Sequence, residues 1–215
     1  MEEKEPMRGE RKIGGFILAG GESSRMGRDK ALLEIGGMPL IERATRLVES
    51  VAGNCVIVGD SVRLEGLALR IVADDFPGAG PLGGIATALR ASSAEWNLIV
   101  ACDLPYLTRE WLAYLAERAL RSDADAVLPM NELPMNKMGV EPLCAMYRKG
   151  GEGAIREALG RGTRKVTDGL AQVRTEFIAP AEWKGFDSEG LLFKNMNSPA
   201  DYEEAKARIH GRTSR

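Results

Sequence analysis

The chain has 215 residues, of which 44% are hydrophobic and 28% are charged, and its formal net charge is −2 at pH 7. This length fits one large domain, and the near-neutral charge gives no support for nucleic-acid or membrane partners. No apolar run approaches the ~18 residues of a membrane-spanning helix, and the polar residues 1–12 do not match a signal peptide. We expect a cytoplasmic protein with a disordered polar tail over residues 1–12, one domain over 13–210 and a short tail over 211–215.

Strand and helix patterns alternate along the chain. Apolar runs predict strands at residues 13–19, 55–59, 69–73, 97–102, 125–129 and 142–147. Several are almost continuously apolar, as in a parallel sheet covered on both faces. Sequence patterns typical of helices predict helices over residues 39–52, over 108–122 with Thr108 as the N-cap, and over 198–210 with Ser198 as the N-cap. The alternation predicts an α/β fold, a three-layer sandwich with a mostly parallel, Rossmann-like sheet.

The chain has few residues suited to metal binding or to a nucleophilic triad. Its three cysteines, Cys55, Cys102 and Cys144, are far apart and lie in apolar runs, which indicates reduced, buried thiols. Its one histidine is His210, near the C-terminus. A histidine-rich metal site and a Ser-His-Asp triad are therefore not expected.

The loop after the first predicted strand combines glycines with cations. Gly20 and Gly21 are followed by Arg25 and then by Arg28, Asp29 and Lys30. Loops at this edge of an α/β sheet carry ligands, and glycines let backbone N–H groups approach phosphate oxygens. A Walker A motif is excluded because Gly21 and Gly27 are one residue too far apart, and no G-x-G-x-x-G fingerprint is present.

The full string Leu-Ala-Gly-Gly-x-x-x-Arg-Met-Gly-x-Asp-Lys, from Leu18 to Lys30, resembles the signature of GT-A-like nucleotidyltransferases. It is most similar to that of the molybdenum cofactor guanylyltransferase family. Later blocks resemble the same family in the same order: "ADDFPGAGPLGGIATAL" from Ala73, "CDLPYL" from Cys102, "EPLCAMY" from Glu141 and "KNMNSPADYEEA" from Lys194. The resemblance runs from Ile13 to about His210 and implies the GT-A-like nucleotidyltransferase fold.

This resemblance implies transfer of GMP from GTP to molybdopterin, with release of pyrophosphate. Its implied partners are GTP and molybdopterin, together with cofactor-delivery proteins and apo-molybdoenzymes. By position, the resemblance implies that Leu18, Ala19 and Gly20 contact the nucleotide through their backbone and that Gly21 admits the phosphates. It implies that Arg25 and Lys30 stabilise the triphosphate. It also implies that Asp74 binds the nucleotide and that Asp103 binds Mg²⁺.

The chemistry of the residues is compatible with these roles. Mg²⁺ takes one or two carboxylates, and Asp103 directly follows a predicted buried strand. The alternative role of Asp103, as the cap of the following helix, is less favoured because Thr108 already serves as that cap. Asp74 is equally compatible with a turn. A phosphate nucleophile is ionised at neutral pH, so no general base is needed.

Some positions leave the assignment open. The family often has asparagine where this chain has Gly59, and residues 131–143 replace a loop that is commonly basic or carries histidine. Asn195 and Asn197 fit either the phosphate end of the site or the cap region of the last helix. Candidate ligands for the pterin phosphate, each also compatible with a solvated surface charge, are Lys137, Arg148, Arg161, Arg164 and Lys165.

Two other kinds of function remain as alternatives. One is a different nucleotidyltransferase, either a molybdopterin cytidylyltransferase or a sugar-phosphate guanylyltransferase. Cytidylyl members usually carry alanine at the position of Gly20. The other is a non-catalytic nucleotide-binding delivery protein, for which loss of Lys30 or Asp103 would have been expected.

Overall fold

The computed structural model describes residues 13–20, 29–60, 62, 64, 68–133 and 137–213. The predicted tail over residues 1–12 lies outside this part of the chain. At the other end the last helix continues to Thr213. No helix in the described residues is long and apolar enough to cross a membrane.

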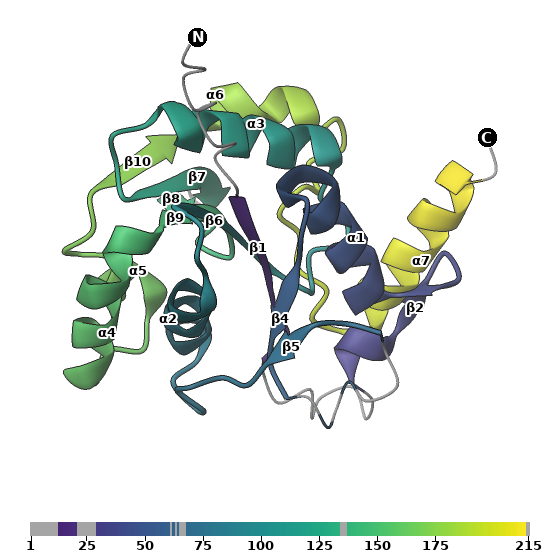
Figure 1. Ribbon diagram of the computed structural model, residues 1–215. Coiled ribbons are helices and arrows are strands. Elements are labelled where there is room, and N and C mark those ends of the chain that lie inside the picture. The colour runs from purple at the N-terminus through teal and green to yellow at the C-terminus, as the bar shows by residue number, and fades with distance from the viewer. Residues whose placement is uncertain are drawn as a thin grey trace, which may run out of the picture.

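A central sheet of eight strands organises the molecule (Figure 1). Its strands are β1 (Ile13–Leu18), β4 (Val56–Val58), β5 (Ile71–Val72), β6 (Trp96–Ala101), β7 (Ala126–Leu133), β8 (Lys137–Val140), β9 (Cys144–Arg148) and β10 (Thr175–Ile178). The order across the sheet is β10-β7-β9-β6-β1-β4-β5, and β8 pairs with β7. The pairs β10–β7, β6–β1, β1–β4 and β4–β5 are parallel, whereas β9 is antiparallel to both of its neighbours. The predicted α/β class and mostly parallel sheet are thus confirmed.

Helices cover both faces of the sheet, as Figure 1 shows for α1 on one side of β1 and α2, α4 and α5 on the other. The α-helices are α1 (Leu40–Ala52), α2 (Pro81–Ala91), α3 (Arg109–Arg121), α4 (Glu152–Gly160), α5 (Val166–Gly169), α6 (Pro180–Trp183) and α7 (Pro199–Thr213). Short 3₁₀ helices are η1 (Lys30–Leu32), η3 (Lys149–Gly151) and η4 (Lys184–Phe186), and a small hairpin is formed by β2 (Glu34–Ile35) and β3 (Met38–Pro39).

Strand alternation divides the apolar residues into two cores. In β1, Ile13 and Ile17 belong to the core under α1, α3 and α6, whereas Phe16 and Leu18 belong to the core under α2, α4 and α5. Successive side chains of a strand point to opposite faces, so an unbroken apolar run fills both cores at once. This explains why β1 is buried at every position.

Helix α2 is not among the helices predicted from the sequence. The turn before it ends at Gly80, which has a φ of 68°, and the helix begins at Pro81. Gly83 and Gly84 lie inside the helix and are buried. A Cβ at Gly83 would come within 2.9 Å of the Phe76 Cβ, and one at Gly84 within 3.3 Å of Leu18. The glycines weaken helix propensity but permit this close packing on the sheet.

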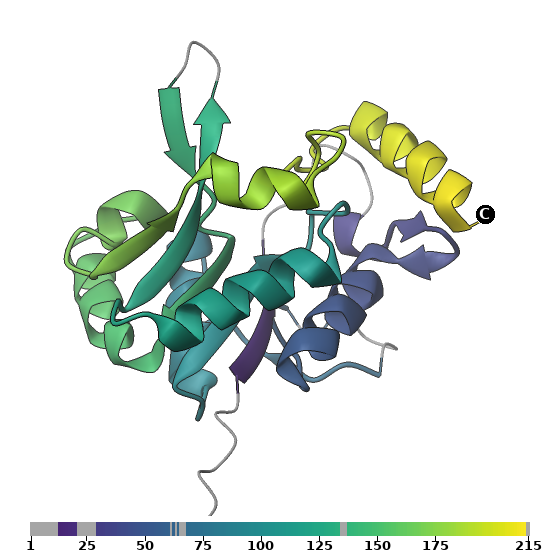
Figure 2. The same cartoon turned by 90° about the horizontal axis from the view of Figure 1, so that it is seen from above.

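The strand predicted at residues 125–129 is longer than expected. β7 continues to Leu133 and pairs with β8, which was not predicted, so that residues 131–133 and 137–140 are paired strands rather than a loop. Figure 2 shows these two strands projecting from the body of the molecule. We call the paired residues 130–133 and 137–140 the arm. The prediction also missed β10, on the outer side of β7.

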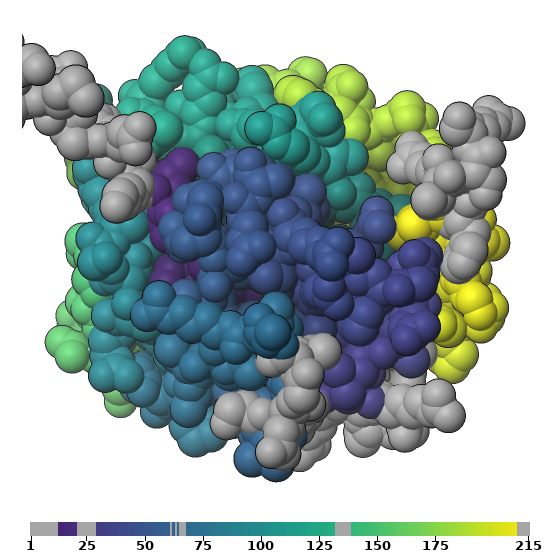
Figure 3. All heavy atoms as spheres, turned by 45° about the vertical axis from the view of Figure 1, so that its right-hand side comes forward, coloured from purple at the N-terminus to yellow at the C-terminus, as the bar shows by residue number. Residues whose placement is uncertain are grey.

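A third apolar cluster joins the N-terminal hairpin to the C-terminal helix. Ile35 and Leu40 pack with Met196, Ala205 and Ile209. In the space-filling view, the dark blue segment that includes η1, β2 and β3 lies next to the yellow α7 (Figure 3). Helix α7 begins as predicted, with the Ser198 Oγ accepting from the Asp201 backbone N–H at 3.2 Å. This packing places the segment before α7 beside the residues that follow the glycine loop.

Candidate active site

A cavity of about 640 Å³ lies at the carboxyl ends of β1, β4 and β6. This size is in the range of small-molecule sites, and this edge of the sheet is where α/β folds bind ligands. The described residues that line it are Leu18, Ala19, Gly20, Asp29, Lys30, Ala31, Val58, Asp74, Gly78, Gly80, Pro81, Gly84, Ala101, Cys102, Asp103 and Leu143.

The end of β1 contributes backbone to the cavity wall. Its neighbours hold it in place, since the Ala19 N–H donates to the Val58 carbonyl at 2.9 Å and the Cys102 N–H donates to the Leu18 carbonyl at 3.2 Å. Gly20 is exposed, and a Cβ built on it meets no heavy atom within 4 Å. The predicted nucleotide-lining residues 18–20 therefore all border the cavity. Gly21 and Arg25, predicted to act on the phosphates, lie outside the described residues.

Lys30 lies at the start of η1. The Asp29 carboxylate caps this short helix by accepting from the Ala31 N–H at 3.0 Å. The Lys30 ammonium donates to the Asn197 Oδ1 at 3.0 Å, across 167 residues of sequence. The structure thus brings together the cation after the glycine loop and an amide that precedes α7.

Asp103 lies just beyond the end of β6 and is partly buried. Burial raises the pKa of its carboxyl group, and the charge of nearby Lys30 acts in the opposite direction. Asp103 is not needed as a helix cap, because the Thr108 Oγ accepts from the Trp111 N–H at the start of α3. Its carbonyl accepts from the Met196 N–H at 2.9 Å, which holds the segment containing Asn197 against the Asp103 loop.

The donor set suits magnesium better than a metal that needs an all-protein cage. Within the described residues, no group of three or more His, Cys, Asp or Glu side chains could hold a metal ion together. Mg²⁺ commonly takes one or two carboxylates and completes its shell with phosphate oxygens and water. Asp103 borders the cavity and supplies a carboxylate of this kind.

Asp74 borders the same cavity from the opposite side. Its Oδ1 accepts from the Phe76 N–H and from the Thr87 Oγ, both at 2.9 Å. These bonds are those of a turn residue, which was the alternative interpretation of this aspartate. They tie the loop before Gly78 to helix α2, so Asp74 also shapes the wall that a nucleotide would contact.

Other residues considered from the sequence are engaged outside the cavity wall. Arg148 stacks on Trp96 with its guanidinium carbon 4.7 Å from the ring centroid. Three others contact neighbours in or beside α4 and α5: Arg161 pairs with Glu157, Arg164 donates to backbone carbonyls, and Lys165 pairs with Asp168. The side chain of Lys137 lies outside the described residues. Asn195 is exposed and does not line the cavity.

Sequence reasoning did not single out Asp29, Pro81 or Leu143 as lining residues. Pro81 and Leu143 lie within quoted sequence blocks, yet only the folded sheet shows that they face the same cavity as Gly20. Leu82, the next residue of α2, is fully buried and does not line the cavity. Gly59 also lies near this edge, and a Cβ on it would approach the Ala19 carbonyl oxygen to 3.3 Å.

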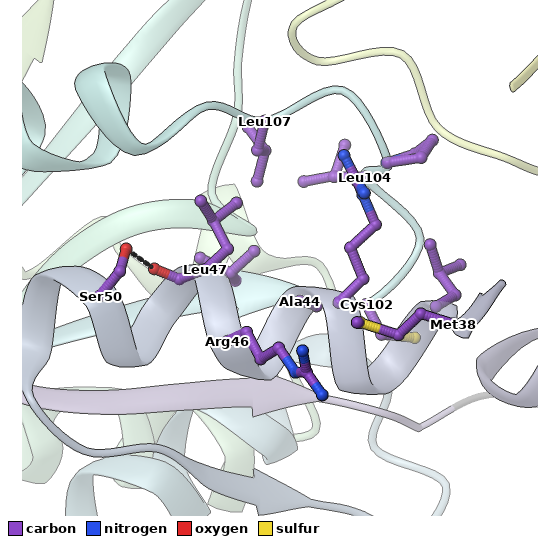
Figure 4. A pocket seen from close by; sticks show the side chains of 12 residues that line it. Met38, Ala44, Arg46, Leu47, Ser50, Cys102, Leu104 and Leu107 are labelled. Atoms are coloured by element: carbon purple, nitrogen blue, oxygen red, sulfur yellow. Dashed lines mark hydrogen bonds between the residues drawn. The ribbon is translucent and has the colours of Figure 1, made fainter. Parts of the chain in front are cut away.

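A second, smaller cavity of about 330 Å³ lies on the other side of Cys102 (Figure 4). Leu47 of α1 faces Leu104 and Leu107 of the loop after β6 across it. Its walls are mainly aliphatic, and the guanidinium of Arg46 pairs with Glu42 at 2.6 Å. The larger cavity, with Lys30 and Asp103, is the better candidate for a phosphate-bearing ligand.

The fold and the site together define an α/β nucleotidyltransferase, and comparison with known proteins identifies the family. Residues 15–175 match the MobA-like NTP transferase domain, and the chain belongs to this family. It is 36% identical over 203 residues to a probable molybdenum cofactor guanylyltransferase of Pelotomaculum thermopropionicum, covering 94% of each chain. It is 37% identical over 189 residues to a protein of the same description from Carboxydothermus hydrogenoformans, covering 87% of this chain and 92% of the relative.

A solved structure shows the same architecture. The molybdopterin-guanine dinucleotide biosynthesis protein A of Archaeoglobus fulgidus superposes with a TM-score of 0.78 at 25% identity, covering 91% of this chain and 98% of that one. The GT-A-like nucleotidyltransferase fold inferred from the sequence is thereby confirmed.

Proposed function

We propose that this protein transfers GMP from GTP to molybdopterin, forming the guanine dinucleotide cofactor and pyrophosphate. The observation that carries this proposal is the placement of Lys30 and Asp103 at one cavity that residues 18–20 also line. The relatives described as probable molybdenum cofactor guanylyltransferases support the choice of substrates. In this reaction an acceptor phosphate oxygen bonds to the α-phosphorus of GTP, and the bond to the leaving pyrophosphate breaks.

Lys30 would stabilise charge that develops on the leaving pyrophosphate. Its ammonium is held at the cavity by Asn197 and therefore needs little rearrangement to meet a phosphate. Asp103 would hold Mg²⁺, which supplies positive charge to the phosphate oxygens when bound. Gly21 and Arg25 complete the proposed phosphate-binding set, and Leu18, Ala19, Gly20 and Asp74 the proposed nucleotide wall.

The acceptor phosphate needs no general base because it is already ionised at neutral pH. We also propose a cytoplasmic location for this biosynthetic enzyme. It is supported by the three free thiols, of which Cys55 and Cys144 are buried and Cys102 partly so. Cofactor-delivery proteins and apo-molybdoenzymes would then receive the product.

The test is a pyrophosphate-release assay with each of the four NTPs, with and without molybdopterin and with and without Mg²⁺. We expect release only with GTP, molybdopterin and Mg²⁺ together, and a product that contains equal amounts of pterin and guanine. A preference for CTP would contradict the guanylyl assignment. GTP binding with no release under any condition would favour a delivery protein instead.

A further inference from the structure

The turn between β8 and β9 carries one carboxylate, Glu141, two residues before Leu143, which lines the cavity. The Glu141 N–H donates to the Pro129 carbonyl at 2.9 Å, and the Cys144 N–H closes the turn on the Glu141 carbonyl at 3.2 Å. Two residues after Glu141, the carbonyl of Leu143 accepts from the Ala101 N–H at 2.8 Å, and Leu143 itself lines the cavity. The turn is therefore bonded to both β7 and β6 and is held firmly at the cavity edge.

The side chain of Glu141 has an unusual environment for a carboxylate. It is partly buried, and its Oε1 accepts from the Asn131 Nδ2 at 2.6 Å. Burial raises the pKa of this carboxyl group, and the bond from Asn131 opposes that effect only in part. Among the described residues, no lysine or arginine forms an ion pair with Glu141, whereas Glu176 pairs with Arg118.

Such an arrangement is costly for folding. A carboxylate withdrawn from water loses hydration, and a single neutral amide replaces only part of it. Groups kept in this condition beside a cavity are candidates for ligand binding, because a ligand can supply the missing donors. The rigid turn and the Asn131 contact, which comes from the arm, hold the carboxylate in one orientation.

The order of strands indicates which substrate Glu141 would meet. The proposed nucleotide wall belongs to the end of β1 and to the segment after β5, and Asp103 follows β6. The Glu141 turn lies on the other side of β6, next to β9 and β7. If the nucleotide occupies the first side and phosphoryl transfer takes place near Asp103, the acceptor must lie on the side of Glu141.

We propose that Glu141, oriented by Asn131, binds the 2-amino-4-oxopyrimidine edge of the acceptor's pterin ring. This edge presents two parallel N–H donors, on N3 and on the 2-amino group, and one carboxylate offers two oxygens that match them. Asn131 is the positioning residue in this site, and Glu141 is the residue that contacts the ligand. The inference rests on the proposed function, which supplies the pterin. Guanine carries the same donor pair, so the experiment must separate the two sources.

The first experiment measures binding of pterin and of lumazine, its 2-oxo analogue, to the full chain by their fluorescence. Lumazine has an oxygen in place of the 2-amino group, so it loses one hydrogen-bond donor and places an acceptor against the carboxylate, which repels it. A buried polar group left unpaired costs a factor of about 10 or more, so we expect at least tenfold tighter binding of pterin. Glu141→Gln should abolish this preference and Asn131→Ala should weaken it, whereas Glu110→Gln, on the exposed first turn of α3, should leave it unchanged.

The second experiment compares KM values for both substrates in wild type and Glu141→Gln. We expect the KM for molybdopterin to rise about tenfold or more and the KM for GTP to stay within about twofold, with the thermal midpoint unchanged or higher. A rise in the KM for GTP instead would assign Glu141 to guanine and overturn the inference. A lower midpoint with both KM values unchanged would make the Glu141–Asn131 pair a structural contact and also overturn it.

The two proposals can fail separately. If wild-type protein transfers nothing to molybdopterin but prefers pterin to lumazine, and Glu141→Gln removes that preference, then the pterin site is supported and the proposed reaction is wrong. If wild-type protein makes the dinucleotide and Glu141→Gln binds pterin and lumazine as wild type does, the reaction is supported and the inference about Glu141 is wrong.

Discussion

Replacing Gly20 with alanine tests base selection without disturbing the fold. Gly20 borders the cavity, its φ is not in the left-handed region, and a Cβ on it would meet no protein atom within 4 Å. A Gly-to-Ala change at such a position typically stabilises a protein by about 0.4–1 kcal/mol, because the unfolded chain loses freedom. We therefore expect an unchanged or slightly higher thermal midpoint, and any loss of activity must come from the ligand.

The effect on GTP can be estimated from the space that the methyl group takes. If the purine lies against Gly20, as the guanylyltransferase assignment implies, the added methyl costs the bound base about 1–3 kcal/mol. This corresponds to a fall in kcat/KM for GTP of about 5- to 150-fold. A pyrimidine is smaller, so kcat/KM for CTP should change much less and the preference for GTP should fall by a similar factor.

The assay measures kcat/KM for GTP and CTP by pyrophosphate release with molybdopterin, together with thermal unfolding. Gly185→Ala is the matched control, because Gly185 is also exposed, also has free space around it and lies in η4 away from the cavity. An unchanged GTP-to-CTP ratio in Gly20→Ala would refute the reasoning and move base selection to the loop around Asp74.

Three further substitutions separate catalysis from folding. Asp103→Asn should abolish nearly all turnover at saturating Mg²⁺, and near-normal turnover would exclude the metal role. The thermal midpoint should be unchanged or higher, because burial raises the pKa of this carboxyl group and so disfavours its ionised form. Lys30→Ala should lower kcat by orders of magnitude. Loss of the exposed bond to Asn197 should lower the free energy of unfolding, measured with denaturant, by less than about 1 kcal/mol. An unchanged kcat with a large loss of stability would make Lys30 a structural residue. Leu82→Ala should reduce the free energy of unfolding by about 2–5 kcal/mol, because this side chain is fully buried. The control Leu32→Ala, whose side chain is 42% exposed, should cost less than about 0.5 kcal/mol, and equal costs would contradict the packing of α2.

Local sequence patterns were sufficient for the class of fold and for the position of the first loop. An apolar run such as Phe16–Leu18 predicts a strand because period-two burial on both faces needs no distant information. The caps Thr108 and Ser198 were predicted correctly for the same reason, since each bonds within its own first turn. The sequence also grouped Gly20, Lys30 and Asp103 as site residues, through motif spacing and a resemblance to a family.

Tertiary structure alone decided the elements whose stability comes from distant partners. Helix α2 contains Gly83 and Gly84, which lower helix propensity, and only the close approach of Phe76 and Leu18 explains them. Likewise, β8 is stabilised by the extension of β7, and no local pattern encodes that pairing.

The contacts that give the site its character have the same origin. Lys30 meets Asn197 because α7 packs on the hairpin that follows η1. Glu141 meets Asn131 because β8 pairs with β7 and brings Val140 opposite Met130. Helix and strand periodicities are local properties of the chain, whereas these pairs form only when the sheet and its helices bring separate segments together. The sequence by itself therefore grouped the main candidate site residues, and packing decided which of them meet and which further residues line the cavity.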